Sequence, residues 1–470
     1  MKFTGFNSGR LWPIPLLLAI MILAGCGSMA TRKDFYEPIV AGTRAGAFDS
    51  VVVRMEQARE SGKYGEKDRV VYYLDAGLAY HYAERYDTSN VRLQAAEAAS
   101  EELFTRSISK AALSLLLNDN ALDYAGEDYE VLYANLIGAL NYLALDDFEN
   151  AFVEIRRANL KLEQLEKKYA DAAQSFQRGA LEDKDAIKID YEADPVRFHN
   201  SAFARYLSMH MYAAVDKLSD ADLDYELMLH AFQNQPQIYD FTPPDVVYSA
   251  EDGDAVLSVV ALAGLSPVKE ALNLRIRTDK DLNLVQILYD GPDSAEAEYG
   301  HIPMEVSEDY YFKFAIPQLE DRTSDIARIS VRVDGEPIGD LQLLEDVGAV
   351  ARDTFRAKKS LIYLRSVARA VVKGLIAHKQ KQKADTGGLG GWLKKAAIDV
   401  VTDLTENADL RCARLLPGYI FVGDFELPQG THDLTVEYYS VDGAMLESFS
   451  YPNYEINPRR FNLVQTVLPR

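Results

Sequence analysis

Two stretches in the first half of the chain repeat one pattern of small, aromatic and apolar residues, 62 positions apart. The matched residues are Gly77 and Ala139, Tyr80 and Tyr142, Ser89 and Ala151, Leu93 and Ile155, and Ala96 and Ala158. Spacings of three and four residues place them on single faces of helices, and turn-forming residues stand between the two halves of each copy. Such hairpins bury their apolar faces only against neighbouring copies, so the pattern predicts a stacked helical array.

The pattern resembles the tetratricopeptide repeat. In that repeat, a small residue on the first helix lets the second helix approach, the tyrosine fills the space beside it, and small residues on the second helix admit the next copy. The resemblance is degenerate, because Tyr73 and Asn135 stand where the repeat usually has tryptophan. Simple packing of helical hairpins, without a true repeat, is the alternative interpretation.

Other segments extend the helical pattern. The second half of the pattern also occurs at 51–58, and a shorter match at 231–236 indicates a fourth, poorer copy. An insert at about 104–131 separates the two good copies and predicts one further helix at 104–117. Apolar residues form a seam over 155–176, which predicts a long helix that either packs along the array or projects from it.

After two consecutive prolines at 243–244, the apolar residues alternate as they do in half-buried strands. The predicted strands cover 255–260, 273–277, 283–288, 311–316, 329–333, 419–427, 433–440 and 461–468. A helical stretch at about 345–406, divided by a glycine-rich run, interrupts them. We therefore predict an α+β fold, with an all-α, tetratricopeptide-like array at 26–240 and an antiparallel β domain at 245–470 that holds an inserted helical hairpin.

The chain begins with the pattern of a secretion signal. Two positive charges precede an apolar run at 16–23, which is too short to span a bilayer comfortably. The run ends in residues that resemble the lipobox of bacterial lipoproteins: Leu23, Ala24, Gly25 and Cys26. The resemblance implies that 1–25 is a cleaved signal peptide and that Cys26 carries a lipid anchor in the membrane. Gly27 follows the cysteine, which by the same resemblance favours the periplasmic face of the outer membrane. An ordinary signal peptide with a chance cysteine is the alternative.

The chain as a whole is acidic, with 72 Asp and Glu against 50 Lys and Arg and a formal net charge of -22. Such a field repels nucleic acid, so we expect no nucleic-acid partner. The stretch 351–383 opposes this field, because it is amphipathic and holds ten basic residues against the single acid Asp353. Arg365, Arg369 and Lys373 are its candidates for contact with an anionic surface. The alternative is a solvated face, or pairing with the protein's own acidic helices.

A search for chemistry in the sequence finds no GxSxG, HExxH, P-loop or CxxC pattern, and we expect no catalytic residue, metal site or cofactor. The lipobox, the repeats and the segments 264–269, 316–317 and 408–411 together resemble a family of bacterial lipoproteins with degenerate tetratricopeptide repeats. This resemblance implies no particular activity. The favoured function is a scaffold that binds an envelope protein or peptide in envelope assembly or regulation. The alternative is an envelope hydrolase or transferase whose site is assembled from dispersed acids, histidines and tyrosines.

Overall fold

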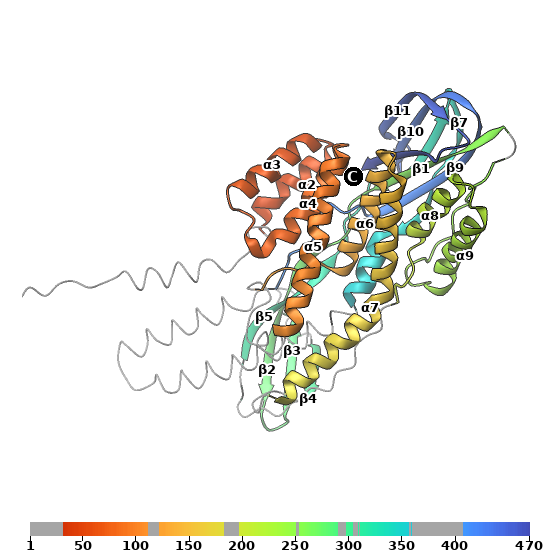
Figure 1. Ribbon diagram of the computed structural model, residues 1–470. Helices are drawn as coiled ribbons and strands as arrows, with labels where there is room; N and C mark the ends of the chain where they lie inside the picture. The colour runs from red at the N-terminus through yellow and green to blue at the C-terminus, as the bar shows by residue number, and fades with distance from the viewer. Residues whose placement is uncertain are drawn as a thin grey trace, which may run out of the picture.

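The computed structural model describes residues 32–110, 122–182, 197–250, 253–289, 298–303, 309, 311–356, 359 and 408–470. Several predicted features lie outside these residues: the signal peptide at 1–25, the lipobox Leu23, Ala24, Gly25 and Cys26, and the basic residues Arg365, Arg369 and Lys373. Within the described residues, helices fill the first half and strands fill most of the second (Figure 1). The predicted mixed α+β class is therefore confirmed.

The helices of the first half follow one another as hairpins. Their bounds are α2 (Lys33–Arg44), α3 (Phe48–Glu60), α4 (Arg69–Tyr82), α5 (Tyr86–Lys110), α6 (Asp128–Ala144), α7 (Phe148–Glu182), α8 (Ala202–Ala214) and α9 (Leu218–Asn234). The hairpins pair α2 with α3, α4 with α5, α6 with α7, and α8 with α9, and each packs against the next. In this arrangement each hairpin buries its apolar face against its neighbours.

One turn geometry recurs at the tips of these hairpins. The turns pass through Gly46, Glu84, Asp146 and Asp216, with left-handed φ angles of 71°, 56°, 61° and 58°. In each turn, the N–H of the following residue donates to the carbonyl five residues earlier at 2.9 Å, as Arg85 does to Tyr80. This bond gives a donor to a carbonyl in the last turn of the helix, which has no hydrogen-bond partner within the helix. The first helices of the four hairpins therefore end with the same local geometry.

The small residues of the repeated pattern lie where helices approach most closely. A Cβ atom on Gly77 would stand 2.5 Å from Cδ2 of Leu93, and Ser89 Oγ donates to the Gly77 carbonyl at 2.7 Å. The other small or apolar positions of the pattern are also buried: Ala96, Ala139, Ala151, Ile155 and Ala158. Tyr80 and Tyr142 are half buried at the rims of these interfaces. Larger side chains at the buried positions would force the helices apart.

Two predictions within the helical half are corrected. Helix α5 continues through Phe104 to Lys110, so no separate helix begins at 104. The residues 103–110 include no glycine or proline that would end α5 earlier. Helix α6 starts at Asp128, inside the predicted insert. The long helix predicted over 155–176 is present as α7, and the seam residues with described side chains are buried: Ile155, Ala158, Leu162 and Leu165. This part of the seam belongs to the core.

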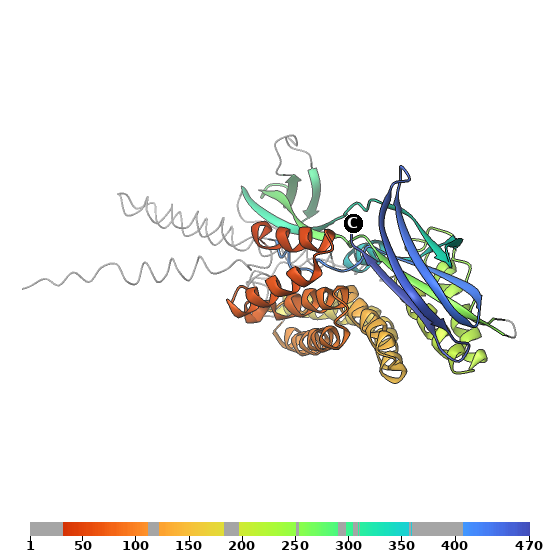
Figure 2. The same cartoon turned by 90° about the horizontal axis from the view of Figure 1, so that it is seen from above.

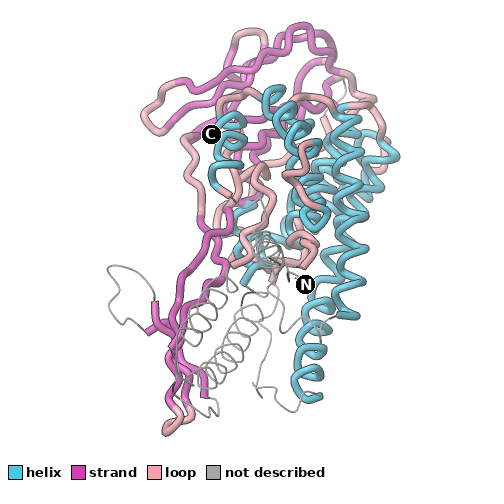
Figure 3. The backbone as a smooth tube through the Cα atoms, turned by 90° about the vertical axis from the view of Figure 1, so that its left-hand side faces the viewer, coloured by secondary structure: helices cyan, strands magenta, loops and turns pink. Residues whose placement is uncertain are grey.

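The described strands form three sheets of four strands each. The central sheet has the order β12-β1-β9-β8, the outer sheet β11-β10-β6-β7, and the third sheet β4-β3-β2-β5. Their bounds are β1 (Asp254–Ala263), β2 (Val268–Asp279), β3 (Leu284–Tyr289), β4 (Glu298–Pro303), β5 (Tyr311–Glu320), β6 (Ile326–Val333), β7 (Glu336–Asp340), β8 (Gln342–Asp346), β9 (Tyr419–Pro428), β10 (Gly430–Ser440), β11 (Met445–Ile456) and β12 (Asn462–Leu468). Figure 3 shows the third sheet extending away from the other two. It points toward the end of the molecule where the C-terminal part of α7 lies.

The sheets differ from the prediction in their strands and in their pairing, and the strands β4, β7, β8 and β11 were not predicted. β1 and β12 run parallel, with Leu257 opposite Asn462, so the β region is not purely antiparallel. The parallel pair arises because β12 enters the central sheet from the outer sheet, after β11, rather than through a hairpin with β1. In addition, the helical stretch predicted from about 345 begins with β8, and a helix follows only at 347–356.

The central sheet is buried on both faces. Leu257, Val259 and Ala261 of β1 pack with residues of the outer sheet, whereas Val260 and Leu262 belong to the apolar core of the helices. Successive side chains of a strand point to opposite faces, so one strand serves both cores. Figure 1 shows the resulting layers, with β10 and β11 of the outer sheet above β1 and β9 and with α8 below them, and Figure 2 gives the view from above. One continuous core thus includes side chains from both halves of the chain.

Strand β12 forms one edge of the central sheet, and tyrosines of β11 cover it. The Tyr451 hydroxyl donates to the Gln465 carbonyl at 2.9 Å, and the Tyr454 hydroxyl donates to the Leu463 carbonyl at 3.2 Å. These carbonyls alternate along β12 and point away from β1. Side chains therefore occupy two of the acceptors that an added strand would use.

Candidate binding cleft

The first helix of each hairpin contacts the second half of the chain. The contacts join Tyr36 on α2 to Arg414, Tyr82 on α4 to Leu415, Tyr133 on α6 to Glu345, and Tyr206 on α8 to Asp424. We call this side of the array, formed by α2, α4, α6 and α8, the inner face. It is occupied by the protein's own central sheet and by the segment 408–416.

The segment 408–416 has no regular secondary structure and is held by its main chain. Glu130 on α6 accepts the N–H of Ala413 at 2.7 Å. Asp75 on α4 accepts the N–H groups of Arg414 at 2.7 Å and Leu415 at 3.3 Å. Burial raises the pKa of Glu130 to about 7 and that of Asp75 to about 6. The inner face thus binds an extended segment of the same chain through buried carboxyl groups.

Arg411 anchors this segment. Its guanidinium is buried and donates to both oxygens of Asp409, at 2.9 and 2.8 Å. It also donates to Asp68 Oδ1 at 3.3 Å and to the Leu122 carbonyl at 2.9 Å. A bidentate pair with further acceptors satisfies a buried guanidinium, so the sequence motif at 408–411 has a structural role here.

Glu345 is a second anchor between the two halves. This buried side chain accepts hydrogen bonds from the Tyr133 hydroxyl at 2.6 Å and from the Tyr239 hydroxyl at 2.8 Å. It also accepts from Ser201 Oγ at 2.9 Å and from the Phe203 N–H at 3.1 Å, at the start of α8. Burial raises the pKa of Glu345. A carboxyl group at this place favours the N-terminus of α8 and fixes it to β8.

A serine, a histidine and an aspartate meet beneath α8, and their geometry bears on the hydrolase hypothesis. Asp424 Oδ1 lies 3.2 Å from Nε2 of His210. Ser258 Oγ lies 3.4 Å from Nδ1 and 3.5 Å from Nε2 of the same ring. In a catalytic triad the serine and the carboxylate use opposite ring nitrogens. Here the serine favours neither nitrogen, and all three side chains are buried. We therefore assign this cluster to packing.

The second helices of the hairpins expose their far sides to solvent. We call this side, formed by α3, α5, α7 and α9, the outer face. Each of its helices carries an exposed large apolar residue: Val53, Val91, Leu160 and Leu223, with exposed fractions between 52% and 61%. Single exposed apolar residues also occur elsewhere on the molecule, as at Val441 and Met445, so they do not by themselves mark an interaction surface.

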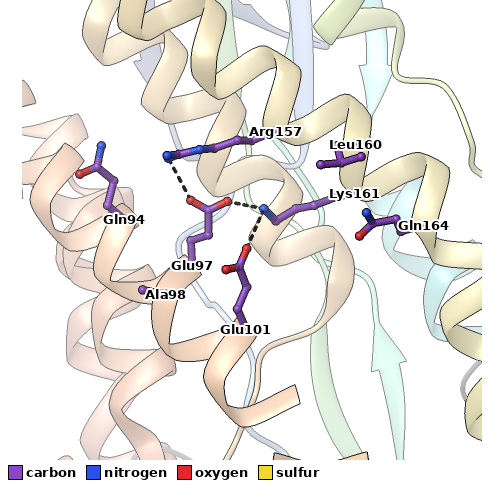
Figure 4. A pocket seen from close by; sticks show the side chains of 8 residues that line it. All are labelled: Gln94, Glu97, Ala98, Glu101, Arg157, Leu160, Lys161 and Gln164. Carbon is purple, nitrogen blue, oxygen red and sulfur yellow. Dashed lines mark hydrogen bonds and ion pairs between the residues drawn. The ribbon is translucent and has the colours of Figure 1, made fainter. Parts of the chain in front are cut away.

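A cleft of about 410 Å³ lies on the outer face between α5 and α7 (Figure 4). Its lining consists of Gln94, Glu97, Ala98, Glu101, Arg157, Leu160, Lys161 and Gln164. Ion pairs cross it: Arg157 lies 3.2 Å from Glu97, and Lys161 contacts Glu97 and lies 3.7 Å from Glu101. The cleft therefore presents both signs of charge, two amide side chains and an exposed leucine.

Asn135 of α6 lies beneath this cleft. Its amide nitrogen donates to Glu97 at 3.1 Å and to Glu154 of α7 at 2.7 Å. Arg157 also contacts Glu154, at 3.0 Å. Burial raises the pKa of Glu154, and the bonds from Asn135 and Arg157 oppose that shift. The carbonyl oxygen of Asn135 is buried and has no hydrogen-bond partner in the described part of the chain.

The residues predicted from the repeat pattern lie between helices rather than in this cleft. Sequence reasoning missed the cleft residues Glu97, Arg157 and Lys161, and Glu154, which contacts Arg157. Two signals pointed to them: Asn135 is polar at a position where the repeat has tryptophan, and Glu97 and Glu154 adjoin the small or apolar pattern residues Ala96 and Ile155. Among the basic residues predicted at 351–383, the described Arg352 and Arg356 pair with the protein's own acids, at 2.6 Å from Asp321 and Asp353 respectively.

In the described residues, no group of three or more His, Cys, Asp or Glu side chains is arranged to hold a metal ion. Among the described helices, none has the length and apolarity needed to cross a membrane. The chain matches no known protein-family model, and no curated protein or solved structure shows a significant similarity to it.

Proposed function

We propose that this protein is a lipoprotein anchored at the periplasmic face of the outer membrane. On this proposal it is a tetratricopeptide-like scaffold that binds an envelope protein or peptide. The lipobox ending in Cys26 supports the anchor. The recurring hairpin turn and the buried small residues of the pattern support a repeat array.

The observation that carries the proposal is the division between the two faces of the array. The inner face is occupied by the central sheet and the segment 408–416. The outer face holds the α5–α7 cleft, and in the described part of the chain no segment of the second half is hydrogen-bonded to the residues that line it. A partner therefore binds at the outer face in this proposal, and the β half serves to fix the array.

Site-specific photo-crosslinking in the native envelope tests this assignment. A photoreactive amino acid replaces Gln94 on α5 or Gln164 on α7, both exposed in the cleft. The matched control replaces Glu336, an exposed residue of β7 in the outer sheet. We expect one discrete crosslinked product from both cleft positions and none from the control. Equal products from all three positions, or products from the control alone, would contradict the outer-face assignment.

A further inference from the structure

Strand β11 forms an open edge of the outer sheet. Figure 1 shows β10 between β11 and β7, and among the described strands β11 is hydrogen-bonded only to β10. The opposite edge, β7, contains Pro337, which has no N–H to offer to an added strand. Between residues 447 and 451, β11 contains no proline, and its residues Ser448 and Ser450 are exposed to solvent. This stretch of β11 is therefore accessible to a further strand.

The hydrogen bonds at the two ends of β10 show which of its residues bond to β11. The N–H of Asp334, which follows β6, donates to the Asp433 carbonyl at 2.9 Å. The N–H of Ser440, at the other end of β10, donates to the carbonyl of Ala444, just before β11, at 2.9 Å. The bonding direction alternates along a strand, so odd-numbered residues of β10 bond to β6 and even-numbered residues bond to β11.

The register then shows which residues of β11 face outward. Val436 of β10 lies opposite Phe449, so the main chain of Phe449 bonds to β10. Its neighbours Ser448 and Ser450 direct their N–H and carbonyl groups away from the sheet. In agreement, the N–H of Ser448 donates to Oε1 of Glu447 at 3.3 Å, a side-chain acceptor rather than a strand. The edge thus offers main-chain donors and acceptors that no described strand uses.

The core of the outer sheet is incompletely covered beside this edge. The ring of Phe449 packs against Tyr438, with 5.7 Å between the ring centroids, yet Phe449 and Tyr451 are only half buried. An added strand would place side chains beside Phe449 and extend this core. The open stretch is short, because Pro452 lacks an N–H and Asn453 has a left-handed φ of 55°.

From these observations, we propose that β11 pairs with β11 of a second copy of this chain, antiparallel, about a twofold axis at Phe449. Ser448 of each copy then lies opposite Ser450 of the other, and each such pair exchanges two main-chain hydrogen bonds. The two Phe449 rings become cross-strand neighbours. Glu447 lies opposite Tyr451 of the other copy, so the two Glu447 carboxylates stay apart.

The occupant is a second copy because the edge is complementary to itself. Under the twofold axis every outward N–H meets an outward carbonyl, the half-buried aromatic residue covers its own counterpart, and like charges do not meet. An isologous contact of this kind uses one patch twice and closes after two copies. It lies on the outer sheet rather than on the outer face of the helices, so it goes beyond the proposed scaffold function.

Sedimentation velocity of the full chain in a neutral detergent tests for the second copy. Micelles are kept in large excess, so that two chains do not share one micelle by chance. Between about 1 and 100 µM protein, we expect the dimer fraction to rise with concentration, because the contact is small and the association is weak. A monomer at every concentration would overturn the proposal.

Substitutions at Ser450 connect the dimer to this edge. Ser450→Pro removes an outward N–H but no bond between β11 and β10, so it should raise the dissociation constant of the dimer at least tenfold. The matched control Ser450→Ala keeps the N–H and should change that constant less than twofold. Near-ultraviolet circular dichroism shows whether each variant is folded. If Ser450→Pro is not folded, Ser448→Lys combined with Ser450→Lys decides the matter, because it sets lysines of the two copies opposite each other. Dimerisation of either folded variant at the original strength would refute pairing through β11.

Single cysteines test the twofold register. The Cα atoms of a non-hydrogen-bonded antiparallel pair lie about 4.5 Å apart, which is within the range of a disulfide. Phe449→Cys should therefore give a disulfide-linked dimer on oxidation with copper phenanthroline. Ser448→Cys should give little, because the two copies of that residue are displaced from each other along the strands. The original chain, whose Cys412 is buried, is the control. Equal linkage of both variants, or linkage of Ser448→Cys alone, would contradict the axis at Phe449.

Discussion

At the scale of single residues, buried polar groups set how the protein responds to pH. Glu130 and His81 have opposite effects on how the free energy of unfolding changes with pH. The pKa of Glu130 is raised to about 7, so its contribution to stability is present below about 4.5 and is lost as the pH rises through 7. The pKa of His81 is lowered to about 4 by burial. An unfolded histidine has a pKa near 6.5, so between about pH 6.5 and 4 the unfolded chain binds a proton at His81 and the folded chain does not. Its contribution is lost as the pH falls from about 6.5 to 4.

Replacing His81 with Gln should reduce the dependence of the free energy of unfolding on pH in the acidic range. His81 Nδ1 lies 2.6 Å from Asn141 Oδ1, and a Gln amide can still donate to that oxygen. Without the titrating ring, the free energy of unfolding should fall less steeply between about pH 6.5 and 4, by up to about 1.4 kcal/mol per pH unit. Urea unfolding at a series of pH values measures this slope. The same slope in both proteins would contradict the assignment of a buried, neutral His81.

At the scale of elements, the close approach of helices depends on side chains no larger than a methyl group. Ala139 on α6 and Ala151 on α7 are both fully buried. Replacing either with Leu should lower the free energy of unfolding by about 1–3 kcal/mol, because the added atoms overpack the interface. Val91→Leu on the exposed side of α5 is the control and should change it by less than about 0.5 kcal/mol. Chemical denaturation compares the three variants, and unchanged stability of both alanine variants would refute close packing at these positions.

The sequence predicts the helices better than the sheets, and the reason is the range of the interactions. A helix and its turn depend on local interactions, so the helical positions of Gly77 and Ala139 followed from spacing, and the turns followed from the turn-forming residues between the helices. A strand is defined by its partner. β8 pairs with β9, which lies far along the chain, and the short run Gln342–Asp346 beside a helix gave no periodic signal of its own. The parallel pairing of β1 with β12 has the same cause.

The cleft escaped prediction for a related reason. Its lining comes from two helices, α5 and α7, and no single spacing brings Glu97, Arg157 and the underlying Asn135 of α6 together. The repeat pattern identified the buried small residues but carried no information about the polar residues between them. Only the stacking of α5 and α7 over α6 places these charges in contact.

At the scale of the whole molecule, Arg411 links the segment 408–416 to the helices. Replacing Arg411 with Ala should destabilise the protein by about 3–5 kcal/mol, because it leaves the buried Asp68 and the partly buried Asp409 without their cation. Arg332→Ala on the outer sheet removes a more exposed arginine and should cost less than about 1 kcal/mol. Thermal and chemical unfolding measure both variants. Equal, small effects would show that the segment does not hold the two halves together.

The proposed lipid anchor makes a separate prediction for the whole molecule. Replacing Cys26 with Ser should move the protein from the membrane fraction to the soluble fraction, because a serine hydroxyl cannot form the thioether that carries the lipid. Fractionation of cell envelopes after a high-salt wash, followed by immunoblotting, measures the distribution. The anchor proposal is refuted if the Ser variant still sediments with outer membranes as the original chain does.

The tyrosines that cover β12 have a consequence for crowding. Molecules tethered to one surface meet repeatedly in the same orientation, so an uncovered strand at the edge of a sheet would bring neighbouring copies into register for pairing. The hydroxyls of Tyr451 and Tyr454 already occupy alternate carbonyls of this edge. If the proposed lipid anchor holds many copies on one membrane, these two occupied carbonyls disfavour pairing of β12 with the same strand of a neighbouring copy.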